Sequence, residues 1–262
     1  MDTSEDTTTR NRLPQRLQAW LGTLRSMAIY WRPGRQAGLR RLYSVFVQPG
    51  DLVFDIGAHI GDRTRAFAAL GARVVALEPQ PQILLLLRKA TARLSDVRIR
   101  REAAGPENGT AQLEVSRSHP TVSSVSRRFT REIAQRNRSF RNVSWDEQIA
   151  VPMVTLDQLI VDHGLPAFCK IDVEGLEAEV LRGLSQPIPA LSFEFVAGAE
   201  EVTEDCLAHL TALGDYEYNL IVGEQRHFRF DTWQDAGAIR SWLEQHADRV
   251  GSGDIYARLR GA

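Results

Sequence analysis

The sequence is poor in cysteine and has no long apolar run. Its 262 residues include two cysteines, Cys169 and Cys206, and neither has the spacing of a disulfide framework or a Cys/His metal site. We therefore expect a reducing, cytoplasmic setting. No apolar run exceeds five residues, so we expect neither a signal peptide nor a transmembrane segment.

An excess of charge of one sign is also missing. Charged residues make up 25% of the chain, but the formal net charge is only -1. The protein thus has no overall field that would draw it to nucleic acid or to a membrane, and we expect no nucleic-acid partner. The 43% hydrophobic content is enough for one substantial core in a chain of this length.

The N-terminal segment is rich in arginine and has an apolar stripe. Eight arginines and no acidic residue lie between Arg10 and Gly50. Six apolar side chains recur at helical spacing, namely Leu17, Trp20, Leu21, Leu24, Met27 and Ala28. This predicts an amphipathic helix over 13–30, after a disordered tail at 1–9. The helix is short, which favours packing on the domain over a membrane-surface or partner helix. The same helix could instead form the contact of a homodimer, and this alternative stays open. We divide the chain into this tail and helix, 1–45, and one domain, 46–262.

Strand-like and helix-like segments alternate along that domain. Strands are expected at 52–56, 73–78, 97–101, 167–173 and 190–195, and helices at 62–70, 81–94 and 175–182. The C-terminal third is expected to add helices at 201–213 and 232–247 and strands at 216–222, 226–231 and 255–259. The pattern predicts an α/β fold with a mostly parallel sheet, an antiparallel edge, and helices on both faces.

Residues 105–150 interrupt this alternation. The polar stretch at 116–145 carries seven arginines and one glutamate, which makes it an arginine-rich insertion in the domain. Insertions of this length are often lids or substrate-facing elements, and a solvated helical excursion is the equal alternative. If the stretch faces the substrate, its arginines indicate an anionic group on the acceptor.

The segment VFDIGAHIGDRT, at 53–64, predicts a ligand-binding turn between a strand and a helix. It lacks the GxGxxG spacing of dinucleotide-binding turns, and Asp55 would repel a pyrophosphate two residues before Gly57. Such a carboxylate suits a cationic ligand group, as in S-adenosylmethionine. Gly57 would let the backbone approach the ligand, and Gly61 is the second glycine of the turn.

A second acidic residue should then hold the ribose diol of that cofactor. Glu78 ends the next strand, 21 residues after Gly57, where a carboxylate can accept from two hydroxyls. Further along, the segment FCKIDVEG places Asp172 and Glu174 at the end of another apolar strand, at alternate positions that predict one shared face. A variant Rossmann oxidoreductase fits the glycine turn too.

Several motifs together resemble the FkbM-type S-adenosylmethionine-dependent methyltransferases. They are DIGAHIG, ALEP, Ser123-Ser124, TLDQLI, KIDVEG with EVLRGL, and SFEF, and they extend over roughly 40–222. The resemblance implies a class I methyltransferase fold, Rossmann-like, and O-methylation of a hydroxyl on a sugar, glycan or polyketide-type secondary metabolite. By analogy, the cofactor site would include Asp55, Gly57, Ala58, His59, Gly61, Glu78, Ala104, Ser124 and Asp172. His59 departs from the family, which more often has Asn there.

Methyl transfer to a hydroxyl requires something that takes the hydroxyl proton. The candidate catalytic residues are Asp172, Glu174 and Glu194, with His59 as a weaker candidate. Asp172 is the first hypothesis for the base, and Glu174 would support the turn or act only as a residue near a helix N-terminus. A magnesium ion is conceivable on these carboxylates, but no His/Asp/Asp set predicts a metal site, so we rank a metal-free base first.

Three other functions compete with this interpretation. A nicotinamide-dependent oxidoreductase would need GxGxxG and a Tyr-x-x-x-Lys proton donor, which the sequence lacks. A non-catalytic interaction module would have lost the acids at 55, 78 or 172, and all three are present. A nucleic-acid methyltransferase would need its own catalytic motif and a strongly basic surface.

Overall fold

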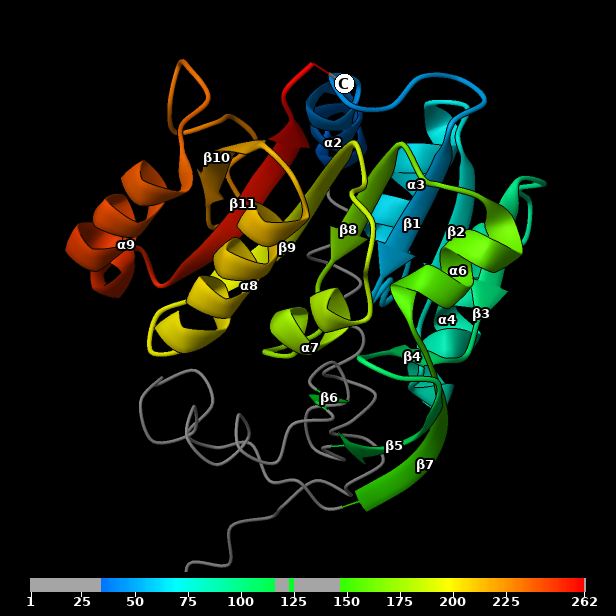
Figure 1. Ribbon diagram of the computed structural model, residues 1–262. Helices are drawn as coiled ribbons and strands as arrows, with labels where there is room; N and C mark the ends of the chain where they lie inside the picture. The colour runs from blue at the N-terminus through cyan, green and yellow to red at the C-terminus, as the bar shows by residue number, and fades with distance from the viewer. Residues whose placement is uncertain (1–33, 116–122, 125–146, 262) are drawn as a thin grey trace, which may run out of the picture.

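A computed structural model describes residues 34–115, 123–124 and 147–261 of the chain (Figure 1). The helix expected at 13–30 and nearly all of the arginine-rich stretch at 116–145 lie outside these residues.

The main sheet has seven strands in the order β10-β11-β9-β8-β1-β2-β3. Five are parallel, namely β1 (Leu52–Ile56), β2 (Arg73–Leu77), β3 (Val97–Arg100), β8 (Phe168–Ile171) and β9 (Ala190–Val196). The other two form the antiparallel edge, namely β10 (Tyr216–Val222) and β11 (Ser252–Leu259). The chain moves outward from β1 to β3 and then returns to β8 on the other side of β1. Ligands bind beyond the carboxyl ends of the strands at such a reversal.

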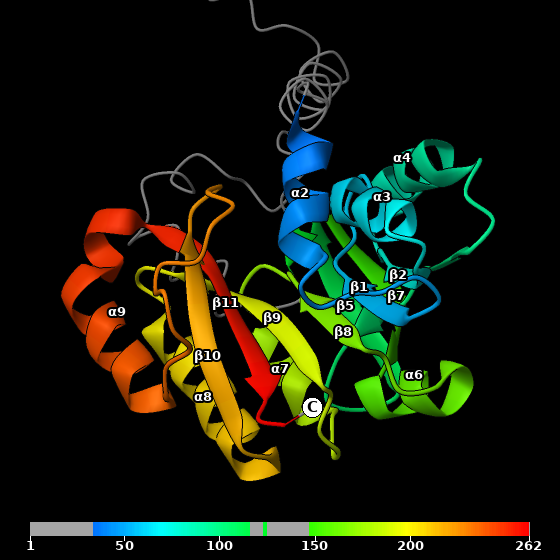
Figure 2. The same cartoon turned by 90° about the horizontal axis from the view of Figure 1, so that it is seen from above.

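Helices cover both faces of this sheet (Figure 2). One face carries α2 (Arg35–Tyr43), α3 (Asp62–Ala69) and α4 (Pro81–Thr91), and the other carries α6 (Leu156–His163), α7 (Glu177–Arg182), α8 (Glu200–Leu213) and α9 (Ala236–Val250). Successive strand side chains point to opposite faces, so Val53 packs with the first group and Phe54 with the second. The expected α/β fold with a mostly parallel sheet is confirmed.

The folded core begins earlier in the chain than the expected boundary at residue 46. Helix α2 was not expected as a separate element, yet its Leu39, Leu42 and Tyr43 are buried in the core beside α3. Arg35 at its first turn is buried as well and pairs with Asp62 of α3. The arginine-rich composition hid these contacts, because only a few apolar positions of α2 face inward.

Two expected strands differ from the observed ones. Residues 226–231 do not form a strand; instead the Asn219 side chain accepts from the backbone of Phe230 and donates to it, which holds this segment as a loop. Strand β8 ends at Ile171, so Asp172 and Glu174 follow the strand and do not continue its alternation. Glu174 has a left-handed backbone, with φ 55, which turns the chain sharply there.

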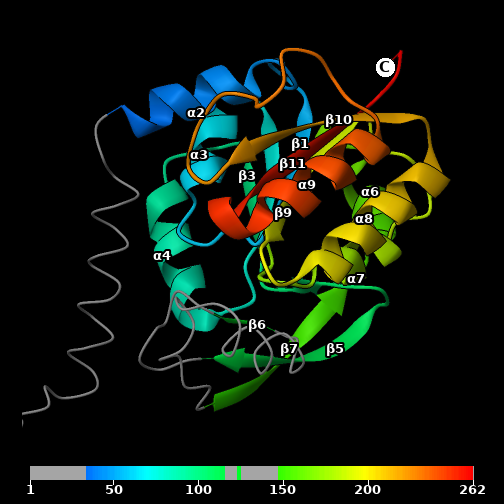
Figure 3. The ribbon, with the colours of Figure 1, turned by 90° about the vertical axis from the view of Figure 1, so that its left-hand side faces the viewer.

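A second, four-stranded sheet lies beyond the carboxyl ends of the main sheet (Figure 3). Its order is β4-β7-β5-β6, with β4 (Ala103–Ala104), β7 (Glu147–Val154), β5 (Gly109–Val115) and β6 (Ser123–Ser124). It has a small apolar cluster of its own, formed by Ala103, Ala111, Leu113 and Val151. The interruption seen in the sequence at 105–150 therefore contains β5, β6 and the first half of β7 of this added sheet.

In the described part of the chain, no helix is both long enough and apolar enough to cross a membrane.

Candidate functional site

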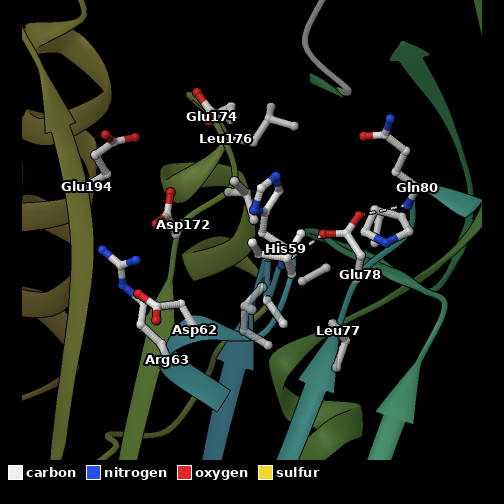
Figure 4. Close-up of a pocket in the computed structure, with 18 of the residues that line it drawn as sticks. His59, Asp62, Arg63, Leu77, Glu78, Gln80, Asp172, Glu174, Leu176 and Glu194 are labelled. Carbon is white, nitrogen blue, oxygen red and sulfur yellow. Dashed lines mark hydrogen bonds between the residues drawn. The ribbon is translucent and has the colours of Figure 1, made fainter. Parts of the chain in front are cut away.

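A cavity of about 250 Å³ lies at the carboxyl ends of the parallel strands. Its walls come from the turn after β1, the ends of β2 and β8, the facing ends of β9 and β11, and the small sheet. Figure 4 shows Asp172, Glu174 and Glu194 on one side of His59, and Glu78 and Gln80 on the other. The cavity therefore has two ends of different composition, joined by the turn after β1.

The turn after β1 needs a glycine at position 57. Gly57 has φ 78, and a side-chain carbon there would overlap the backbone carbonyl oxygen of Asp172. The backbone N–H groups of Gly57 and Ala58 both donate to the Leu77 carbonyl, at 3.1 and 2.9 Å. The turn is thus held between the ends of β8 and β2, and its backbone lines the cavity.

Glu78 presents both of its carboxylate oxygens to the cavity. One oxygen accepts from the backbone N–H of His59 at 3.0 Å and the other from that of Gln80 at 2.9 Å (Figure 4). A carboxylate oxygen has two lone pairs, so each retains one for a ligand. This geometry suits the two neighbouring hydroxyls of a ribose. Burial raises the pKa of Glu78 to about 7, although the two backbone hydrogen bonds oppose the rise.

His59 adopts a left-handed backbone, with φ 50. Asn and His tolerate this conformation better than most residues, so the turn accommodates His59 at the position where the resemblance led us to expect Asn. Burial lowers the pKa of its imidazole to about 4. His59 is therefore neutral at physiological pH, and its backbone N–H orients Glu78.

Two residues expected to contact the cofactor do not line the cavity. Asp55 points towards α3, because side chains alternate along β1, and its carboxylate accepts from the Thr64 hydroxyl. The expected contact of Asp55 with a cationic ligand group is therefore not formed by this geometry. Gly61 caps α3 and packs against Leu87 of α4, where a larger residue would clash. Both residues hold the turn from behind.

The small sheet forms the wall beside Glu78. Ala104 is buried and lines the cavity together with Ala103 and Leu113. Small side chains leave room there for a flat ring. Ser124 belongs to β6, where it pairs with Glu114 of β5, and its contact with a ligand stays a prediction.

A row of carboxylates crosses the other end of the cavity. Asp254 of β11 lies directly opposite Glu194 of β9, and Asp172 follows β8 on the next strand. Glu174 reaches the same cavity because of its left-handed turn, with Gly175 at φ 91 after it. Glu177 closes that turn, since one of its oxygens accepts from the backbone N–H groups of Val173 and Gly175.

These carboxyl groups differ in how readily they ionise. Burial, followed by repulsion from Asp172 and other acids, raises the pKa of Glu194 well above its usual value. Burial and Asp172 likewise raise the pKa of Glu174 to about 8. Burial would also raise the pKa of Asp172, but attraction from Lys170 and Arg63 outweighs it and lowers that pKa. Asp172 is therefore a weak proton acceptor, whereas the ionised carboxylate of Glu194 is a stronger one.

Sequence reasoning missed three charged residues of this end. Arg63 is the second residue of α3 and Asp254 the third residue of β11, and both line the cavity. Glu177 lies in the first turn of α7, behind the turn that it closes. The acid at 177 could have been read as a turn-closing residue from its place after Gly175. Asp254 gave no local signal, because it reaches the site only through the pairing of β11 with β9.

Among the described residues, no group of three or more His, Cys, Asp or Glu side chains has the arrangement of a metal site. The metal-free base stays a prediction. The described wall at this end is acidic, with Arg63 as a cation among its carboxylates. An anionic acceptor is therefore supported only by the arginines at 116–145, outside the described residues.

We expect the protein without ligand to lose stability as the pH rises from about 6.5 to 8.5. Glu78, Glu177 and Glu174 have folded-state pKa values of about 7, 7 and 8, above the 4.5 of an ordinary glutamate. In this window the folded state retains protons that the unfolded chain has released, so raising the pH favours unfolding. The window starts near 6.5 because His59 has the opposite effect below that pH. Between about pH 4 and 6.5 the unfolded chain protonates His59 while the folded state keeps it neutral, so its contribution to stability there rises with pH.

Thermal unfolding measured across this range should show a falling midpoint, with a smaller slope in Glu174→Gln. A midpoint that rises with pH in the wild-type protein would contradict the buried, raised carboxyl groups.

Comparison with known proteins gave one family and a set of structures. The family model described as "Methyltransferase FkbM domain" matches residues 55–250. No curated protein matches the sequence. Two solved structures are similar, a precorrin-6y C5,15-methyltransferase from Geobacter metallireducens and a TehB-like SAM-dependent methyltransferase from Corynebacterium glutamicum. The first is 13% identical, with 86% of this chain and 87% of that chain covered and a TM-score of 0.42. The second is 10% identical, with 92% and 96% covered and a TM-score of 0.47.

Proposed function

Since the chain belongs to the family of methyltransferases with an FkbM domain, we propose that it transfers a methyl group to a hydroxyl of a sugar or secondary metabolite. It has the class I methyltransferase fold, and its cofactor is S-adenosylmethionine. When bound, this cofactor supplies the methyl group as an electrophile on a sulfonium. The chain must therefore hold the cofactor, align an acceptor oxygen and remove its proton.

The observation that carries the proposal is the geometry of Glu78. Its two oxygens are oriented by backbone N–H groups, and each has a lone pair left for one ribose hydroxyl. Ala104 and Leu113 would lie beside the adenine, and the Gly57–His59 backbone would follow the methionine part. Asp172, ionised and next to Gly57, would receive the ammonium group. Ser124 is retained as a candidate contact from β6.

We assign the base to Glu194, with Glu174 beside it, in place of the first hypothesis, Asp172. The low pKa of Asp172 keeps it ionised but makes it a weak base, whereas the raised pKa of Glu194 makes its carboxylate a stronger one. Glu194 would take the hydroxyl proton while the acceptor oxygen attacks. The acceptor would lie at the carboxylate end of the cavity.

Both cysteines are buried free thiols, which supports a reducing, cytoplasmic setting. The homodimer considered for the N-terminal helix remains a prediction.

Calorimetric titration tests the cofactor part of this proposal first. We expect micromolar binding of S-adenosylhomocysteine and no binding of NAD, because Glu78 suits a ribose diol and Gly57 lies in no GxGxxG turn. Binding of NAD would favour the nicotinamide-dependent oxidoreductase. Binding of neither ligand would favour a non-catalytic interaction module.

A screen of sugar and polyketide acceptors with S-adenosylmethionine then tests the base. We expect Glu194→Gln to lower turnover at least about 100-fold while the affinity for S-adenosylhomocysteine stays within about threefold of wild type. Glu244→Gln, an exposed glutamate of α9, is the control and should leave both unchanged. Full turnover in Glu194→Gln would show that the base lies elsewhere.

A further inference from the structure

Lys170 is a completely buried lysine that the proposed chemistry does not use. It lies in the middle of β8 and its side chain has no exposed surface. Isolated ammonium groups are almost never buried in this way, because removal from water strongly disfavours an unpaired charge. Lys170 must therefore be compensated by partners, and the identity of those partners indicates its role.

Its two carboxylate partners are both residues of the cavity wall. The Nζ atom donates to Asp254 Oδ1 at 2.8 Å and to Asp172 Oδ2 at 3.3 Å. A third contact is longer, to the Ile171 carbonyl at 3.4 Å. The ammonium group thus lies behind the cavity and joins the ends of β8 and β11.

The two carboxylates depend on Lys170 to different degrees. Asp254 has a second cation, Arg63, at 3.9 Å. Asp172 has no other cation within salt-bridge distance among the described residues. Its Oδ1 atom accepts no hydrogen bond from those residues, and 28% of the side chain is exposed towards the cavity. Lys170 therefore fixes one oxygen of Asp172 and leaves the other for a ligand.

We propose that Lys170 is the positioning residue for Asp172, holding its carboxylate so that Oδ1 receives the α-ammonium group of the cofactor. This inference rests on the proposed function, because it assigns Asp172 to the amino-acid end of S-adenosylmethionine. Lys170 itself does not touch the cofactor. Its effect should be confined to ligands that carry the amino-acid part.

Two ligands separate this role from a general structural one. S-adenosylhomocysteine carries the α-ammonium group, whereas 5′-methylthioadenosine keeps the adenosine and the thioether and lacks the amino-acid part. In Lys170→Met, which keeps the length of the side chain and removes its charge, we expect affinity for S-adenosylhomocysteine to fall 10- to 100-fold. Affinity for 5′-methylthioadenosine should stay within about twofold of wild type. Calorimetry measures both.

A double-mutant cycle tests whether Lys170 acts through Asp172. In an Asp172→Asn background, Lys170→Met should cause no further loss of S-adenosylhomocysteine affinity. The double variant removes Lys170 and one of its two carboxylate partners, and the other, Asp254, keeps Arg63 at 3.9 Å. It therefore leaves less uncompensated charge than Lys170→Met alone, which could fail to fold. If the single variant does not fold, the S-adenosylhomocysteine affinity of the double variant is compared with that of Asp172→Asn. A further loss in the double variant would overturn the inference.

Three results would overturn the inference. They are equal losses for the two ligands, an unchanged affinity for S-adenosylhomocysteine in Lys170→Met, and additive losses in the cycle. Failure of the wild-type protein to bind S-adenosylhomocysteine would instead refute the proposed function, and this inference with it. Binding by the wild type together with any of those three results refutes only the role of Lys170.

Discussion

Gly57→Ala should lower the free energy of unfolding by about 4 kcal/mol and remove cofactor binding, the largest effect expected of a single substitution in this protein. Two costs add at this position. An alanine at φ 78 is strained by about 1–2 kcal/mol, and its side chain would overlap the carbonyl oxygen of Asp172, which is backbone and can move only if the end of β8 shifts.

Gly50→Ala is the matched control for this experiment. Gly50 has φ 90, so alanine meets a similar backbone strain there, but apart from its two chain neighbours no residue has an atom within 4 Å of the new side chain. Denaturant unfolding of both variants should give a cost of about 1–2 kcal/mol for Gly50→Ala and more than twice that for Gly57→Ala. Equal costs would mean that β8 does not constrain the turn.

Glu78→Gln should weaken the binding of S-adenosylhomocysteine at least about 100-fold. Each hydrogen bond from a ribose hydroxyl to a carboxylate contributes about 1.5–3 kcal/mol, and about 1.4 kcal/mol corresponds to a factor of ten in affinity. An amide has only one acceptor oxygen, so it cannot take both hydroxyls. Calorimetry at a fixed pH of about 8, where Glu78 is ionised, gives the clearest comparison.

Glu102→Gln provides the control for Glu78. Glu102 also lines the cavity, but its carboxylate is paired with Arg100 at 2.7 Å, so we expect a change of less than about threefold. In the wild-type protein, affinity should also rise with pH through about 7, as Glu78 loses its proton, and Glu78→Gln should abolish that rise. A loss in Glu102→Gln equal to that in Glu78→Gln would contradict the assignment.

The sequence correctly placed those residues of the cavity wall that directly follow a strand of the parallel sheet. Gly57 and Glu78 both follow short apolar strands, and parallel strands bring their carboxyl ends to one edge. A carboxylate after a strand could therefore be placed near the glycine turn without knowledge of the structure.

The errors arose where a side chain's direction depends on one residue of register or one backbone angle. Asp55 is still inside β1, so alternation turns it towards α3, whereas the sequence suggested that it faces the ligand. Glu174 was placed on a strand face, but β8 had already ended and a left-handed turn directs it. Asp254 reaches Lys170 from 84 positions away, and no local pattern encodes that contact.

The four-stranded sheet has a consequence for how ligand binding affects the stability of the domain. Ala104 of β4 and Val154 of β7 pack in the main core, whereas the apolar cluster around Leu113 and Val151 is separate from it. The cavity therefore lies between the main sheet and a smaller sheet that is joined to the core only in part. A ligand in contact with both Glu78 and Leu113 would connect the two sheets. Binding of the methyl donor is then expected to raise the free energy of unfolding of the whole domain, by an amount that grows with the occupancy of the cavity.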